Sequence, residues 1–136
     1  MKPDNLLISS YPRIKLADFG NVHILPGGNS TIRGLEGTIS YMSPEMRLGF
    51  NYGTKTDIWS LGITLLNILF DGPTFPNFEL LGPRAARTVA EKQTYLSPHL
   101  KSIICSMFLK NSDRPTAEDL LQVHIISIML MCSIRS

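Results

Sequence analysis

Cysteine is scarce in this sequence: Cys105 and Cys132 are the only two, and neither belongs to a Cys-x-x-Cys or Cys/His pattern. A disulfide framework or a zinc site is therefore not expected, and two reduced thiols of an intracellular protein are the default. Charge of one sign is also scarce, because 13 Lys and Arg against 11 Asp and Glu leave a net charge of +2 without any basic run. This balance favours neither nucleic acid nor a membrane surface as a partner.

Long hydrophobic runs and a secretory signal are missing as well. The two most apolar stretches, residues 58–70 and 125–134, are shorter than the roughly 18–20 residues that a membrane span needs. The N-terminus lacks the basic-then-apolar profile of a signal peptide. We therefore expect no membrane partner and a cytoplasmic location, with the nucleus as the alternative. With 43% hydrophobic and 18% charged residues, the 136-residue chain is expected to form one globular domain.

The order of patterns along the chain predicts a mainly α protein with a small β-hairpin at its start. The strings NLLIS and RIKLA are short apolar or alternating runs separated by turn residues, which is typical of a hairpin. Residues 21–35 read as a surface loop. Helical patterns follow at residues 57–70 and 98–109, and a third helix begins in DRPTAEDLLQV. There Thr116 is placed as an N-cap and Asp119 completes a capping box.

Polar residues at both ends of the predicted hairpin indicate phosphate chemistry. Asp18 in KLADFG ends the second strand, and Gly20 lets the chain turn sharply afterwards. Alone, Asp-Phe-Gly is equally a turn after a strand. However, the hairpin would bring Asn5 beside Asp18, and a carboxylate with an amide oxygen suits Mg²⁺. Lys2 could then reach the same anion as a point charge.

Five segments in this order resemble the C-terminal lobe of a eukaryotic protein kinase: KPDNLL, DFG, GTISYMSPE, DIWSLG and DRPT. The resemblance implies a kinase-like domain over residues 1–126, in which the hairpin is followed by an activation segment and a helical bundle. Residues 127–136 would be an apolar tail. The Lys2-Pro3 pair is similar to Ser/Thr kinases, and GTISYMSPE is most similar to the dual-specific MAP-kinase-kinase branch.

The resemblance also implies roles in a site for ATP and Mg²⁺. Lys2 would contact the transferred phosphate, and Asn5 and Asp18 would be the magnesium ligands. Leu7 would form the floor beneath adenine, which is compatible with an ordinary core leucine. Thr38 would contact the catalytic lysine.

Other implied roles are structural. Phe19 should pack inward and fix the orientation of the preceding aspartate. Glu45 should pair with Arg114 and tie the activation segment to the helical base, with serine at Ser43 in place of the family's usual alanine. Asp57 should hold the backbone of the catalytic loop.

The sequence departs from the family pattern at its start. Met1 stands at the variable position of the catalytic loop, so the catalytic aspartate would fall one residue earlier. The N-terminal lobe, with its Gly-rich loop and strand lysine, has no counterpart in these residues. We therefore expect a truncated lobe that is inactive on its own.

Regulation and the tail are open points. Gly34 stands where many kinases carry an activating phosphosite, which leaves Ser30 and Thr31 as candidate phosphosites in a loop whose composition favours a plain flexible role. The apolar tail either extends the last helix or is sequence read past an exon boundary.

Three functions remain open from the sequence. The chain is a piece of a Ser/Thr kinase that acts on a protein substrate or another kinase, a non-catalytic binding or scaffold module, or a partial gene model. The intact pair of Asn5 and Asp18 favours descent from an active kinase, because a scaffold has no chemical need for it.

Overall fold

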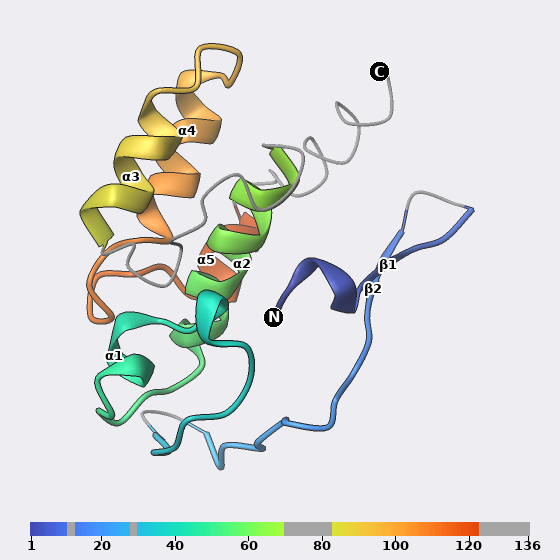
Figure 1. The fold of residues 1–136 in the computed structure, drawn as a ribbon, viewed down its shortest axis with the longest axis vertical. Helices are drawn as coiled ribbons and strands as arrows, with labels where there is room; N and C mark the ends of the chain where they lie inside the picture. The colour runs from blue at the N-terminus through green and yellow to red at the C-terminus, as the bar shows by residue number, and fades with distance from the viewer. Residues whose placement is uncertain (11–12, 28–29, 70–82, 123–136) are drawn as a thin grey trace.

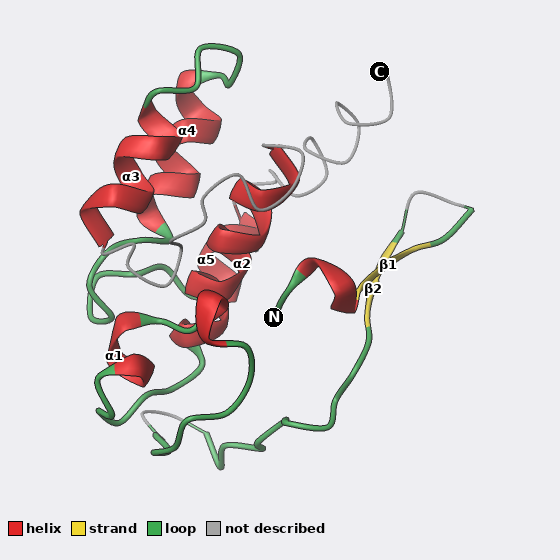
Figure 2. Ribbon diagram, in the orientation of Figure 1, coloured by secondary structure: helices red, strands yellow, loops and turns green. Residues whose placement is uncertain are grey.

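The structure is a computed structural model that describes residues 1–10, 13–27, 30–69 and 83–122. Two short 3-10 turns, two strands and five helices are found in these residues (Figures 1 and 2). In chain order they are η1 (Pro3–Asn5), β1 (Leu6–Ile8), β2 (Ile14–Leu16), η2 (Ile39–Tyr41), α1 (Pro44–Arg47), α2 (Lys55–Leu69), α3 (Pro83–Glu91), α4 (Pro98–Ser106) and α5 (Ala117–Gln122). The predicted fold, a small hairpin followed by a helical assembly, is confirmed.

The two strands form an antiparallel hairpin in which Leu6 pairs with Leu16 and Ile8 pairs with Ile14. One further hydrogen bond extends the ladder, because the Ala17 N–H donates to the Asn5 carbonyl oxygen at 2.9 Å. The hairpin projects away from the helices (Figure 1). Its side chains are exposed on both faces. A two-stranded hairpin with no covered face is marginally stable in water.

Helix α2 is the centre of the helical part. Its apolar sequence contains no proline, and nine of its fifteen residues are buried. Trp59 and Ile63 on one face pack against Ala86 of α3 and against Ile104 and Phe108 of the α4 region. The observed helix begins at residue 55, two residues before the predicted start at residue 57. The predicted last residue, 70, lies outside the described residues.

The sequence analysis missed the four-residue helix α1 and the longer helix α3. Helix α3 shows why. Its apolar positions are small, since Ala86 and Ala90 are fully buried against α2 and α4. Short alanine side chains let α3 and α4 lie side by side (Figure 1), but they carry little of the hydrophobic signal that marks a helix in a sequence.

The predicted helix starts at α4 and α5 are confirmed with their caps. The Ser97 hydroxyl accepts a hydrogen bond from the Leu100 N–H at 3.2 Å. At α5, Thr116 and Asp119 form the expected capping box, since each backbone N–H donates to the other's side chain. Helix α4 ends at Ser106 rather than at residue 109, because the following N–H groups bond three residues back in a tight final turn.

Gly62 permits the closest contact of the core. A Cβ atom at this position would lie 2.8 Å from Cζ of Phe108 and 3.1 Å from Cβ of Met107. The Phe108 ring cannot easily move away, because it is fully buried and stands edge-on to Trp59 with 5.1 Å between ring centroids. The absence of a side chain at Gly62 therefore sets the separation of α2 from the end of α4.

We predict that Gly62→Ala destabilises the protein. Overpacking against Phe108 should cost about 1–3 kcal/mol. The better helix propensity of alanine returns at most about 1 kcal/mol. Urea denaturation should therefore show a lower midpoint, while the control Gly34→Ala should be close to neutral, since its Cβ would have 3.7 Å of space. A midpoint raised by Gly62→Ala would contradict the close contact.

Candidate active site

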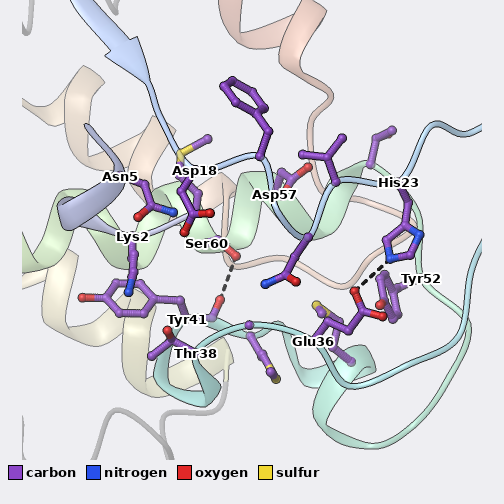
Figure 3. A pocket seen from close by; sticks show the side chains of 18 of the residues that line it. Lys2, Asn5, Asp18, His23, Glu36, Thr38, Tyr41, Tyr52, Asp57 and Ser60 are labelled. Atoms are coloured by element: carbon purple, nitrogen blue, oxygen red, sulfur yellow. Dashed lines mark hydrogen bonds and ion pairs between the residues drawn. The ribbon is translucent and has the colours of Figure 1, made fainter. Parts of the chain in front are cut away.

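A pocket of about 680 Å³ lies between the end of the hairpin and the first turns of α2 (Figure 3). Its walls come from stretches far apart in the chain, mainly residues 1–5, 16–25, 36–46 and 52–60. Several residues that the sequence predicts for the site line it: Lys2, Asn5, Asp18, Phe19, Thr38 and Asp57. The fold thus gathers the predicted polar groups into one cavity.

Asn5 and Asp18 lie side by side because the hairpin closes between them. The hydrogen bond from Ala17 to the Asn5 carbonyl fixes the two segments at the same end of the ladder, and Figure 3 shows both side chains at the pocket edge. Asp18 has a left-handed φ of 62°, which a non-glycine residue adopts at a cost of about 1–2 kcal/mol. Its Oδ1 accepts the Gly20 N–H at 3.4 Å, so this turn holds the carboxylate in place.

The donor set of this pair fits Mg²⁺. It offers one carboxylate and one amide oxygen, and Mg²⁺ is usually held by one or two protein oxygens together with water and phosphate. In the described part of the chain, no three His, Cys, Asp or Glu side chains gather in a way that could hold a metal. A metal that needs a full protein cage therefore has no counterpart in the residues described.

Lys2 and Thr38 enter the same pocket from opposite sides. The Lys2 ammonium lies 3.7 Å from the Asp4 carboxylate, a contact of little energetic value because the Asp4 side chain is mostly exposed. Thr38 precedes η2, and Figure 3 places it below Lys2 across the cavity. No hydrogen bond joins these two side chains in the structure as described, so the predicted contact stays a prediction.

Two apolar residues differ in their surroundings from what was expected. Phe19 is 65% exposed, so the prediction that it packs inward is wrong. The described hydrophobic clusters form around α2 and α1, and none of them reaches Phe19. Leu7 is 54% exposed and lies outside the pocket wall, to which Leu16 contributes instead. Its role beneath adenine stays a prediction.

Asp57 lies in the first turn of α2 and faces the pocket (Figure 3). Partial burial of the carboxyl raises its pKa, and the positive α-amino group of Met1 acts in the opposite direction. The residue as a whole is exposed to solvent. Its carboxylate makes no hydrogen bond within the described ranges, and the predicted role in holding the catalytic loop stays a prediction.

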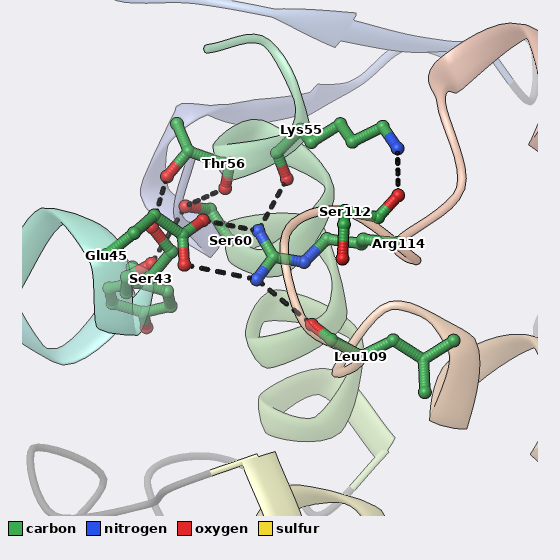
Figure 4. Close-up of polar contacts among 9 residues, drawn as sticks. Ser43, Glu45, Lys55, Thr56, Ser60, Leu109, Ser112 and Arg114 are labelled. Atoms are coloured by element: carbon green, nitrogen blue, oxygen red, sulfur yellow. Dashed lines mark hydrogen bonds and ion pairs between the residues drawn. The ribbon is translucent and has the colours of Figure 1, made fainter. Parts of the chain in front are cut away.

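The predicted Glu45–Arg114 pair is present and buried (Figure 4). Arg114 donates from Nη1 to Glu45 Oε1 at 2.7 Å and from Nη2 to Oε2 at 3.3 Å. The Arg114 side chain is 1% exposed and the Glu45 side chain 12%. The guanidinium also donates to the carbonyls of Lys55 and Leu109 and lies 5.2 Å from the centre of the Trp59 ring.

The pKa of the Glu45 carboxyl reflects its contacts with Arg114. Burial by itself would raise its pKa, but the hydrogen bonds and charge of Arg114, together with the backbone at Glu45 and the Ser43 hydroxyl, more than offset this and lower it. Ser43 is fully buried and shares a 2.5 Å hydrogen bond with the Thr56 hydroxyl. The serine that replaces alanine thus links the activation-segment end to the start of α2.

The sequence analysis missed the residues that hold the floor of the pocket. The Ser60 hydroxyl donates to the Tyr41 carbonyl at 2.8 Å, and the Asn67 amide donates to the Tyr41 hydroxyl at 2.8 Å. Burial raises the pKa of Tyr41, the hydrogen bond from Asn67 opposes this, and the Asp4 charge adds to it. The available signal was a polar stripe at Ser60, Thr64 and Asn67 in an otherwise apolar helix.

A second missed contact closes the loop that was predicted to be plain surface. His23 is hydrogen-bonded through Nε2 to Glu36 Oε2 at 2.9 Å. Further along, Ile32 and Tyr52 form an isolated antiparallel bridge. The candidate phosphosites Ser30 and Thr31 lie just before this bridge. The Ser30 hydroxyl donates to the Gly27 carbonyl and the Thr31 side chain is exposed, but their modification stays a prediction.

Comparison with known proteins matches the family described as protein kinase domain over residues 1–126. The chain belongs to the protein kinase family. Among similar proteins, mitogen-activated protein kinase kinase kinase 3 of Homo sapiens is 30% identical over 136 residues, which cover 95% of this chain and 22% of the human protein. Serine/threonine-protein kinase Nek3 of Oryza sativa subsp. japonica is 33% identical over 141 residues, which cover all of this chain and 24% of that protein.

A higher identity is found over a shorter stretch. Mitogen-activated protein kinase kinase 1 of Arabidopsis thaliana is 47% identical over 66 residues, 48% of this chain and 19% of that kinase. The two kinases matched along nearly the whole chain show that it spans about a fifth to a quarter of their length. In the described part of this kinase chain, no helix is long and apolar enough to cross a membrane.

We predict that Arg114→Ala lowers the free energy of unfolding by about 3–5 kcal/mol, because the Glu45 charge is then buried without a partner. Chemical denaturation should show the loss, and Lys110→Ala, which removes an exposed positive charge nearby, should change the midpoint little. An equally small effect of both substitutions would contradict a structural role of the pair.

The same pair predicts a pH dependence. Since the folded-state pKa of Glu45 is lowered, its contribution is complete above the ordinary glutamate pKa of the unfolded chain and is lost as the pH falls through the lower folded-state value. The difference in stability between the wild type and Arg114→Ala should therefore be largest near neutral pH and shrink under acid conditions. A difference that stays constant down to strongly acid pH would overturn this assignment.

Proposed function

We propose that this chain is the C-terminal lobe of a protein kinase that transfers the γ-phosphoryl group of ATP to Ser or Thr hydroxyls of a protein. The observation that carries the proposal is the hairpin register, which sets Asn5 beside Asp18 in a pocket that also holds Lys2 and Thr38. The name of the similar protein of Oryza sativa, serine/threonine-protein kinase Nek3, supports this choice of acceptor.

The chemistry assigns a part to each residue. The bond between the γ-phosphorus and its bridging oxygen breaks, a bond to the acceptor hydroxyl oxygen forms, and the hydroxyl proton leaves to a base. A magnesium ion held by Asn5 and Asp18 would neutralise charge on the phosphates. Lys2 binds the transferred group as a point charge, and Thr38 orients the Lys2 side chain from the opposite wall.

The base itself and the lysine of the N-terminal lobe are not among these 136 residues. We therefore infer that residues 1–136 do not catalyse the transfer alone. A missing base alone lowers the rate by about 10²–10⁴-fold. The missing phosphate cover lowers it further, since phosphoryl transfer depends on positioning and charge stabilisation.

The specific branch is a finer proposal. The GTISYMSPE segment and the 47% identity to the Arabidopsis mitogen-activated protein kinase kinase 1 support a dual-specific, MAP-kinase-kinase-like enzyme. Its partner would then be another kinase rather than a general protein substrate. We place the domain at residues 1–126, with residues 127–136 as a separate tail, and the protein in the cytoplasm. A non-catalytic scaffold remains the alternative, and the metal test below separates the two.

We predict that Mn²⁺, used as a paramagnetic substitute for Mg²⁺, selectively broadens the NMR signals of residues 2–5 and 17–20 in the full chain. Asp18→Asn should weaken this binding by about tenfold or more, because a carboxylate ligand is lost. The matched control is Asp113→Asn, which removes an exposed carboxylate outside the pocket. If Mn²⁺ broadens these NMR signals equally in Asp18→Asn and Asp113→Asn, Asn5 and Asp18 do not form a metal site. That result would favour the non-catalytic scaffold.

We also predict that the isolated chain shows no phosphoryl transfer with ATP and Mg²⁺. Transfer of radiolabel from γ-labelled ATP to a generic basic protein substrate is the measurement, with Asp18→Ala as the negative control. Transfer above the background of Asp18→Ala would show that these residues supply their own base. The proposal of inactivity would then be wrong.

A further inference from the structure

A second cavity lies between α3 and α4 and shares no lining residue with the pocket described above. This groove has a volume of about 380 Å³. Arg87 and Glu91 line it from α3, and Lys101, Ser102 and Cys105 line it from α4. Its volume is at the low end of the range of roughly 300–1,000 Å³ for small-molecule sites, which suits a few side chains of a bound peptide better than a large cofactor.

The segment that forms the groove is the basic part of the chain. Residues 83–110 contain five Lys and Arg and only one acidic residue, Glu91, and thus have a net charge of +4. The other 108 residues contain eight basic and ten acidic residues, a net charge of −2. The positive charge of the protein is therefore concentrated on the two helices beside this groove.

The two cations in the groove keep donors available. Lys101 Nζ donates to the Glu91 carbonyl at 3.2 Å, which uses one of its three N–H donors and holds the ammonium against the end of α3. Neither Lys101 nor Arg87 has a carboxylate within ion-pair distance among the described residues. Arg87 has five N–H donors in a planar arrangement that matches a carboxylate.

Cys105 lines the groove together with these charged residues. Its Sγ donates weakly to the Arg87 carbonyl at 3.8 Å. Burial raises the pKa of the thiol, the Glu91 charge adds to this, and Arg87 and Lys101 oppose it. Arg87, Glu91 and Lys101 line the same groove as Cys105, so a ligand there would meet Arg87 and Lys101 together.

We propose that this groove docks an acidic segment of a partner protein, with an Asp or Glu carboxylate bound by Arg87 and Lys101. The charge of residues 83–110 complements such a segment and would also steer its approach. Nucleic acid is a poorer match, because no aromatic residue lines the groove for bases to stack on. The docking does not depend on catalysis, so its failure and that of the proposed function are separate results.

Fluorescence anisotropy with the full chain tests the proposal. The probe is a dye-labelled glutamate-rich peptide, and its match has every glutamate replaced by glutamine, both measured at about 0.1 M salt. The glutamate peptide should bind at least about tenfold more tightly. The combined variant Arg87→Gln with Lys101→Gln should lose about tenfold in affinity. The control variant Arg84→Gln with Lys92→Gln removes the same charge from α3 and its end but outside the groove, and should lose no more than about twofold.

Glu91→Gln gives a result that a merely structural role would not produce. Removing the single carboxylate of the groove should tighten glutamate-peptide binding by about two- to fivefold.

The rate at which Cys105 is alkylated is a second measurement, and it needs no substitution in the groove. In a Cys132→Ser background, the glutamate peptide should slow alkylation of Cys105, and the glutamine peptide should not.

The opposite results overturn the proposal. These are equal affinity for the two peptides, equal losses in the groove and control variants, weaker binding by Glu91→Gln, or unchanged alkylation of Cys105. Tighter binding of a thymidine oligonucleotide, lost in the same groove variant, would assign the surface to nucleic acid instead. Equally tight binding of free glutamate would assign it to a small anion.

Discussion

The guanidinium of Arg114 is the contact on which the helical part of this kinase lobe depends. It joins three segments in one buried place: α1 through Glu45, α2 through the Lys55 carbonyl and the ring of Trp59, and the turn after α4 through the Leu109 carbonyl. Four hydrogen bonds from Nη1 and Nη2 offset the desolvation of this buried charge, while Nε has no hydrogen-bond partner among the described residues. The pair therefore fixes where the activation segment ends relative to the central helix.

The two sides of the pocket differ in how firmly the rest of the structure supports them. Thr38 and Tyr41 lie just before α1, and Tyr41 is bonded at both its backbone and its hydroxyl to α2. Asn5 and Asp18 belong to the hairpin, whose side chains are exposed on both faces. The side of the pocket formed by Thr38 and Tyr41 thus rests on a buried core, whereas the side formed by Asn5 and Asp18 rests on three pairs of strand residues.

The sequence predicted the parts of the fold whose signals are local. The hairpin, the apolar α2 and the capping box of Thr116 and Asp119 each follow from a few adjacent residues. Helix α3 was missed because its buried face is alanine, and the support of Tyr41 was missed because Asn67 meets it across 26 residues. The inward packing of Phe19 was predicted by resemblance alone. It failed because inward packing needs a covering surface, and the described residues provide none there.

The arrangement of Asn5 and Asp18, the proposed metal ligands, depends on the hairpin register more than on either residue. Leu6 faces Leu16, and the next bond from Ala17 to Asn5 brings the two ligands together. Slipping one strand by a single residue would send its side chains to the other face and separate Asn5 from Asp18. Register is strongly specified only where one face of a sheet is buried, and neither face is buried here. A surface that covers this hairpin would therefore also fix the position of Asn5 relative to Asp18, because it would bury one face of the sheet.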